Sequence, residues 1–149
     1  MNFKIVNFNE LTVEEMYEIA KSRFEVFVCE QKIVQEQDFD DRDKVSHHIM
    51  LKENDRIVAY SRIVPKGVAY DYISIGRVLV LESHRRKGIA EKMLKATINY
   101  IEQNLSETEI VLSSQLYAKN LYASVGFKEI SEVYDEVEIP HIKMKYISE

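Results

Sequence analysis

The sequence predicts a single mixed α and β domain, and three observations support this. The chain has 149 residues, which is the size of one domain with one proper core. Hydrophobic residues make up 46 % and charged residues 30 %, as in ordinary globular proteins. Strand-like and helix-like segments alternate along the whole chain, with no internal repeat and no linker. We therefore expect one domain over residues 1–149.

The first helix is predicted over residues 12–30, after a short strand over 3–8. Thr12 is placed as its N-cap and Glu15 completes a capping box. Apolar residues then recur at helical spacing. This buried stripe is expected to comprise Met16, Ile19, Ala20, Phe24, Phe27 and Val28. Cys29 is the only cysteine, which excludes an internal disulfide, and we expect its thiol to pack in the core.

Arg23 interrupts this apolar stripe. An arginine on a buried face needs an anionic partner, and Glu30 lies seven residues on, on the same side of the helix. Two interpretations of Arg23 remain equally favoured: a structural ion pair and a role in a functional site.

The segment 31–45 is polar, acidic and aperiodic, which predicts a loop. Its three aspartates, Asp38, Asp40 and Asp43, do not form a calcium loop, because Arg42 occupies the fifth position and the required glycine is missing. No metal is expected. A solvated acidic loop is favoured over a metal site, and attraction of an amine by its charge stays open.

The remaining segments predict strands and two further helices. A hairpin is expected over 46–53 and 56–64, turning at Asn54-Asp55. The longest strand covers 71–81, and Gly76 within it marks a bulge or a close backbone approach. The other predicted elements are a helix over 88–103, a strand over 109–114, a short helix over 118–125, and strands over 127–134 and 140–147.

Residues 84–90, HRRKGIA, place positive charge where a helix begins. Arg85, Arg86 and Lys87 precede the flexible Gly88, between the longest strand and a helix. Exposed helix N–H groups together with fixed cations form an anion site, most naturally for phosphate. The P-loop and the three-glycine dinucleotide patterns are both absent, so the predicted ligand carries phosphate on another kind of strand–loop–helix unit.

Charge and hydropathy exclude several classes of partner. The formal net charge of −5 argues against a nucleic-acid surface. No apolar run approaches the ~18 residues of a membrane helix, and residues 1–10 lack a signal-peptide pattern. We therefore expect a cytoplasmic protein without nucleic-acid or membrane partners.

Two motifs resemble those of the GNAT N-acetyltransferase superfamily. Arg85, Gly88 and Ala90 match its acyl-CoA-binding pattern of Gln or Arg, two variable residues, Gly, one variable residue, then Gly or Ala. About 30 residues on, Asn120 and Tyr122, followed by Gly126-Phe127, resemble its second signature. Nearly the whole chain is similar to the ElaA-like branch. The matching stretches are 23–31, 37–40, His48, 75–78, 113–122 and 138–144.

The resemblance implies an α+β fold, an α/β/α sandwich with a mixed, mostly antiparallel sheet whose central strands splay into a cleft. It implies acetyl-CoA (coenzyme A) as cosubstrate. The backbone of Val78, Leu79 and Val80 would pair with the pantetheine arm, and the N–H groups from Arg86 to Ala90 would hold the pyrophosphate. The full implied cofactor set is Val78, Leu79, Val80, Arg85, Arg86, Lys87, Gly88, Ile89, Ala90 and Asn120.

The resemblance also assigns catalytic roles. Tyr122 matches the usual proton donor to the leaving sulfur, and the N–H near Val78 is the candidate donor to the oxyanion. Direct transfer through a tetrahedral intermediate needs a base, because an amine of pKa ~10.4 is only about one part in 2,000 neutral at pH 7. The base candidates are Glu30, His48 and His141, and the candidates to line the acetyl or acceptor pocket are Arg23, Arg77 and Gln115.

Two functions follow from these residues. The favoured one is an N-acetyltransferase that acts on a primary amine of a small molecule or peptide. The alternative is a non-catalytic acyl-CoA-binding sensor or interaction module. Tyr122 and the polar candidates favour the enzyme, because a mere binder needs only residues 78–90. The last strands are a candidate homodimer interface.

Overall fold

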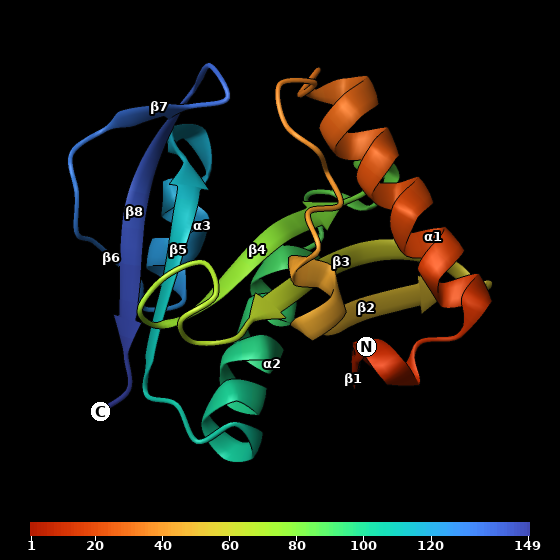
Figure 1. Ribbon diagram of the computed structural model, residues 1–149, viewed down its shortest axis with the longest axis horizontal. Coiled ribbons are helices and arrows are strands. Elements are labelled where there is room, and N and C mark those ends of the chain that lie inside the picture. The colour runs from red at the N-terminus through yellow and green to blue at the C-terminus, as the bar shows by residue number, and fades with distance from the viewer.

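The computed structural model describes all of residues 1–149 and shows one eight-stranded sheet (Figure 1). Its order is β1–β2–β3–β4–β5–β8–β6, with β7 paired to β8. Every neighbouring pair is antiparallel except β4 with β5. The strands are β1 (Lys4–Asn7), β2 (His47–Glu53), β3 (Arg56–Val64), β4 (Ile73–Val80), β5 (Glu109–Gln115), β6 (Lys128–Glu129), β7 (Tyr134–Glu136) and β8 (Ile139–Ile147). The predicted α+β class with a mixed, mostly antiparallel sheet is confirmed.

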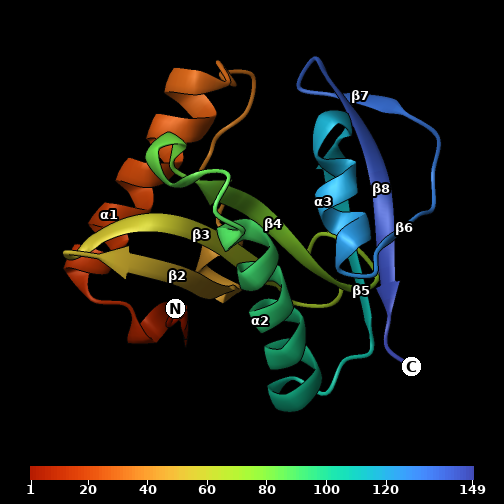
Figure 2. The same cartoon turned by 180° about the vertical axis from the view of Figure 1, so that it is seen from behind.

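Helices cover both faces of the sheet. Figures 1 and 2 show α1 (Val13–Arg23) on one face, and α2 (Ile89–Asn104) and α3 (Lys119–Ser124) on the other. Two apolar clusters accordingly fill the two sides: one packs Ile19 against strands β2 to β4, and the other packs α2 and α3 against the opposite face. The short helical turns are η1 (Phe8–Glu10), η3 (Arg42–Val45), η4 (Glu82–His84) and η5 (Leu116–Ala118). None of the helices has the length and apolar character that crossing a bilayer requires.

The capping box at the start of α1 is confirmed. The Thr12 hydroxyl accepts a hydrogen bond from the Glu15 N–H, and the Glu15 carboxylate accepts one from the Thr12 N–H, each at 3.0 Å. Glu15 is buried and also receives Lys4 Nζ at 2.8 Å and Lys52 Nζ at 2.6 Å. Burial raises the pKa of Glu15, but hydrogen bonds from Lys4, Lys52 and Thr12 outweigh it and bring the pKa to about 2. The carboxylate thus fixes α1 to the sheet.

The first helix changes its winding after Arg23. Residues Phe24–Glu30 form a π-helical segment, η2, whose wider turns rotate each residue away from the position that a 3.6-residue period predicts. Cys29, within this segment, is exposed, and Phe24 at its start is 58 % exposed. The predictions that Phe24 belongs to the buried stripe and that Cys29 packs in the core are wrong. Arg23 itself has no exposed surface.

The hairpin between β2 and β3 is confirmed, because Asn54 and Asp55 both have positive φ, +52° and +65°, as a type I′ turn requires. The strand expected over 127–134 is wrong. Only the short β6 and β7 form there, each paired with β8. Between them the Lys143 N–H donates to the Ser131 hydroxyl at 2.9 Å, in place of a strand carbonyl.

Candidate active site

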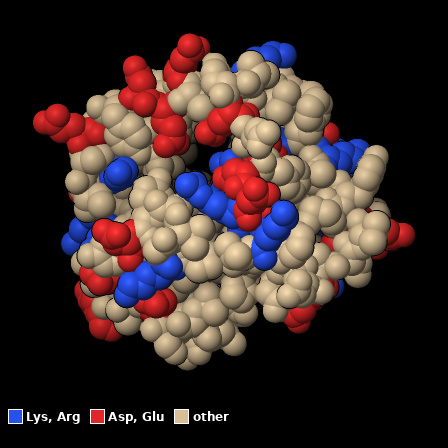
Figure 3. Space-filling model, in the orientation of Figure 1, with Lys and Arg blue, Asp and Glu red and all other residues tan.

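Strands β4 and β5 run side by side over only two residue pairs and then diverge. Ile73 pairs with Ile110 and Ser74 with Val111. Beyond Ser74, the edge of β4 that faces β5 has no strand beside it. A cavity of about 250 Å³ lies in this gap, lined by residues of β4, β5, α3, β8 and the loop after η2. Figure 3 shows a hollow on this face with acidic and basic side chains around it. The predicted splay of the central strands is confirmed.

A β-bulge lies within the stretch of β4, Ser74 to Val78, that lines the cavity. The register passes from Tyr60 opposite Leu79 to Arg62 opposite Gly76, so Arg77 and Val78 together oppose one residue of β3. The bulge predicted at Gly76 is confirmed, but Arg77 is the residue with a positive φ, +53°. That conformation costs a non-glycine residue roughly 1–2 kcal/mol. The Arg77 side chain offsets this by bonding to Asp38, with Nε 3.1 Å from Oδ1.

Three arginines and three aspartates form a network beneath the cavity. Arg23 Nε lies 2.9 Å from Asp38 Oδ2, and Arg23 Nη1 lies 2.6 Å from Asp43 Oδ1. Arg62 forms a two-bond pair with Asp40 at 2.7 and 2.8 Å. Burial raises the pKa of Asp40, but the hydrogen bond and charge of Arg62 outweigh it and bring the pKa to about 2. The network ties the loop after η2 to α1, β3 and β4.

This network corrects two expectations. The partners of Arg23 are Asp38 and Asp43, and not Glu30, because the buried arginine points toward the loop. The loop's three aspartates are not a solvated acidic surface that attracts an amine, because arginines neutralise them. No group of three or more His, Cys, Asp or Glu side chains is arranged to hold a metal ion.

His48 lies outside the cavity, which corrects its placement near the acceptor. Its ring is fully buried, with Nδ1 2.7 Å from the Tyr60 hydroxyl and Nε2 2.9 Å from the main-chain carbonyl of Asp43. Burial lowers its pKa, which keeps the ring neutral. With both nitrogens engaged and no exposed surface, His48 is a structural residue beside the arginine network.

Glu30 is also displaced from the cavity wall. It pairs with Arg85, whose Nη1 lies 3.0 Å from Glu30 Oε2. Arg85 Nε in addition donates to the carbonyl of Val80 at 2.8 Å. The predicted base and the first residue of the acyl-CoA motif therefore bind one another, and neither side chain lines the cavity.

The turn from β4 into α2 fits a phosphate-bearing ligand. Gly88 is the N-cap of α2, with φ +74°, open space beside its Cα, and no side-chain bond to the first N–H groups of the helix. Helix N–H groups without a side-chain cap need another acceptor. Arg86 and Lys87 are exposed and make no ion pair, so their charges are available beside these N–H groups. Ile89 is buried beneath the turn, and Ala90 is half-buried.

Tyr122 of α3 also lines this cavity. Its side chain packs against Phe127 edge to face, and the residue is 8 % exposed. Burial raises the pKa of its hydroxyl, so the group holds its proton at neutral pH. Asn120, two residues earlier, is exposed and does not line the cavity.

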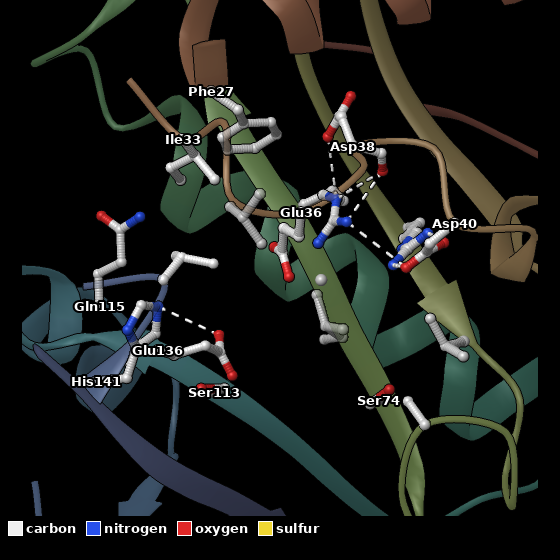
Figure 4. A pocket seen from close by; sticks show the side chains of 18 of the residues that line it. Phe27, Ile33, Glu36, Asp38, Asp40, Ser74, Ser113, Gln115, Glu136 and His141 are labelled. Atoms are coloured by element: carbon white, nitrogen blue, oxygen red, sulfur yellow. Dashed lines mark hydrogen bonds and ion pairs between the residues drawn. The ribbon is translucent and has the colours of Figure 1, made fainter. Parts of the chain in front are cut away.

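His141 of β8 lines the same cavity from the other wall (Figure 4). Its Nδ1 lies 2.7 Å from the carbonyl of Ile139, so this nitrogen carries a proton and donates it. Its Nε2 lies 3.4 Å from the Glu136 carboxylate, and Tyr134 stacks on the ring. His141 is thus the one base candidate of the three that faces the cavity.

The cavity holds further polar groups, some of which the sequence does not single out. Arg77 and Gln115 line it as expected, and Gln115 Nε2 donates to Gln31 Oε1 at 2.9 Å, which joins the two walls. Glu36 and Glu136 were missed. Glu136 is the last residue of β7, just before the turn into β8, but nothing in the local sequence indicates that it meets His141.

A mixed sheet whose central strands diverge beside a basic turn and a helix N-terminus defines an acyltransferase of the GNAT type. The family model described as "Acetyltransferase (GNAT) domain" matches residues 10–148. The chain belongs to this family and is an acyltransferase.

Relatives cover nearly the whole chain. A UPF0039 protein of Schizosaccharomyces pombe is 39 % identical over 97 % of this chain and 96 % of its own length. Protein ElaA of Escherichia coli is 34 % identical over 91 % of this chain and 90 % of its own length. Its crystal structure aligns with a TM-score of 0.88 over 98 % of this chain and 99 % of the ElaA chain. The crystal structure of an acyl-CoA N-acyltransferase from Pseudomonas aeruginosa aligns with a TM-score of 0.90 at 30 % identity. The alignment covers 98 % of this chain and 99 % of that enzyme's chain.

Proposed function

We propose that the protein transfers an acetyl group from acetyl-CoA to a primary amine of a small molecule or peptide, by direct transfer. One observation carries this proposal: Tyr122 and His141 come from α3 and β8 and line one cavity at the open edge of β4. An acid-type and a base-type side chain on one cavity are what amine acylation requires.

Acetyl-CoA supplies an activated acyl thioester when it is bound. The open edge of β4, from Val78 to Val80, offers main-chain groups to an extended amide chain, as an added strand would use them. The N–H groups from Arg86 to Ala90 and the charges of Arg86 and Lys87 hold the pyrophosphate in this proposal.

His141 is the proposed base. Because Nδ1 donates to the Ile139 carbonyl, the free electron pair of the neutral ring is on Nε2. A proton accepted from an alkylammonium by Nε2 faces the Glu136 carboxylate, which compensates the charge of the imidazolium. The same carboxylate favours an ammonium over an anionic acceptor.

Tyr122 acts on the leaving sulfur. A thiolate resembling cysteine has a pKa near 8.5, about 1.5 units below an ordinary tyrosine, and burial raises the pKa of Tyr122 further. Complete proton transfer is therefore uphill, and a hydrogen bond that strengthens as charge develops is the proposed role. The Val78 N–H at the bulge is the proposed oxyanion donor.

The test is release of free thiol from acetyl-CoA in the presence of a panel of amines, with the acetylated product identified by mass. Wild-type protein should release thiol in an amine-dependent manner. Tyr122→Phe should lower kcat by about 10²-fold, the lower end for a positioned proton donor, while binding of acetyl-CoA is retained. Binding of acetyl-CoA without turnover of any amine would contradict the proposal and support the sensor alternative.

A further inference from the structure

Two carboxylates of the cavity have no arginine or lysine partner. The other lining acids, Asp38 and Asp40, are paired with arginines. Glu36 makes no hydrogen bond or ion pair, although it lines the cavity. The Glu136 carboxylate has only the His141 ring within ion-pair distance, at 3.4 Å. Because the arginines and aspartates of the network pair with one another, these two glutamates are the negative charges that remain available to a ligand. Arg42, another lining residue, lies 3.9 Å from Asp40.

The two glutamates approach the cavity from opposite walls. Glu136 comes from β7, beside His141, whereas Glu36 comes from the loop after η2, near Phe27 and Ile33 (Figure 4). An ammonium deprotonated at His141 meets Glu136. Glu36 is on the other wall, so it is placed for a second cation on the same molecule, and Phe27 and Ile33 line the cavity on the same side as Glu36.

A second observation is that one polar group on the cavity wall has no hydrogen-bond partner within the chain. The Tyr122 residue is 8 % exposed and lines the cavity, yet its hydroxyl makes no hydrogen bond within the chain. The hydroxyl oxygen is not among the fully enclosed atoms that lack a partner, so it keeps access to the cavity, where a ligand group is the partner it can take. The glutamates therefore belong to a binding cavity and are not merely an acidic patch.

We propose that the acceptor is an alkyl diamine, whose reacting amine lies beside His141 and Glu136 and whose second ammonium pairs with Glu36. This inference rests on the proposed acetyl transfer and adds the substrate class. The acetyl carbon forms its new bond to the deprotonated amine and loses its bond to sulfur, while the second ammonium stays protonated and unreacted.

The test compares three four-carbon acceptors in the thiol-release assay: 1,4-diaminobutane, butylamine and 4-aminobutanoate. We expect kcat/KM to be about fivefold higher for the diamine than for butylamine after correction for its two equivalent amines, the scale of one partly screened ion pair. The acid should be the poorest acceptor. The preference should shrink as ionic strength rises.

Glu36→Gln should remove the preference, because it should raise KM for the diamine about fivefold more than KM for butylamine. Glu132→Gln is the matched control, because Glu132 is an exposed loop glutamate that makes no ion pair and does not line the cavity. Equal rates for diamine and butylamine in the wild type, or a preference that survives Glu36→Gln, would overturn this inference and leave acetyl transfer standing. Absence of thiol release with every amine would instead overturn the proposed function.

Discussion

Glu30 and Arg85 form a two-bond ion pair between the end of the first helix and the turn before α2. Arg85 Nη1 lies 3.0 Å from Glu30 Oε2, and Nη2 lies 3.1 Å from Oε1. The third donor, Nε, binds the carbonyl of Val80. The planar guanidinium group of Arg85 binds the Glu30 carboxylate and the Val80 carbonyl at the same time. These contacts fix the orientation of the turn before α2. Arg85 thus supports the proposed phosphate site from outside.

Glu30→Gln should weaken acetyl-CoA binding and leave the chemical step intact. The amide keeps at most one of the two bonds to Arg85, so we expect Kd for acetyl-CoA to rise about three- to tenfold, the effect of losing about 1 kcal/mol of a partly exposed pair. Calorimetric titration gives Kd, and kcat is measured at saturating acetyl-CoA. Lys32→Gln, an exposed change nearby, is the control. A large loss of kcat with unchanged Kd would instead make Glu30 the base.

Arg23→Met should destabilise the protein strongly. The variant keeps an apolar stem but leaves Asp43 buried without its main partner, and removal of one member of a buried ion pair costs about 3–5 kcal/mol. Urea unfolding followed by circular dichroism measures the change. Arg56→Met removes an exposed pair with Glu25, with both side chains at least 40 % exposed, and should cost less than about 1 kcal/mol. Similar losses in the two variants would contradict the structural role of Arg23.

Local patterns in the sequence predict much of the fold. The capping box of Thr12, the turn at Asn54-Asp55 and the bulge at Gly76 each depend on residues a few positions apart, so their chemistry can be read without the tertiary structure. The basic turn at 85–87 is likewise local. These features, with the motif resemblance, place the open strand edge and the helix N-terminus correctly.

Pairings between distant segments could not be predicted in this way. Arg23 needs an anion, and Glu30, seven residues on, lies on the same side of a regular helix. The π-helical segment and the folded loop instead bring Asp38 and Asp43 to it. The same loop encloses His48, which a motif comparison placed near the acceptor. Glu36 and Glu136 share a cavity only because β7 and the loop after η2 face one another, and no spacing in the sequence encodes that.

Glu15→Gln should lower stability in a pH-dependent way. The pKa of Glu15 is about 2 in the folded protein and 4.5 ordinarily, so its stabilisation is present above pH 4.5 and is lost as the pH falls toward 2. We expect the variant to be about 2 kcal/mol less stable at pH 6, the scale of hydrogen bonds to a charged group, and the difference to disappear near pH 2. Urea unfolding at several pH values measures it.

Glu14→Gln is the control for this comparison, since Glu14 is an exposed residue of the same helical turn and makes no ion pair. Its effect should be small at every pH. A Glu15→Gln deficit that stays constant between pH 6 and pH 3 would show that the two lysines do not act on the ionised carboxylate.

His141→Ala should lower kcat by about 10²-fold or more, as loss of a general base does. A structural role alone would also lower activity, so the discriminating measurement is rescue by added imidazole. In the alanine variant the space of the ring beside Glu136 becomes available, and a soluble imidazole can accept the proton there. We expect kcat to rise with imidazole concentration in His141→Ala, with no such rise in Tyr122→Phe or the wild type.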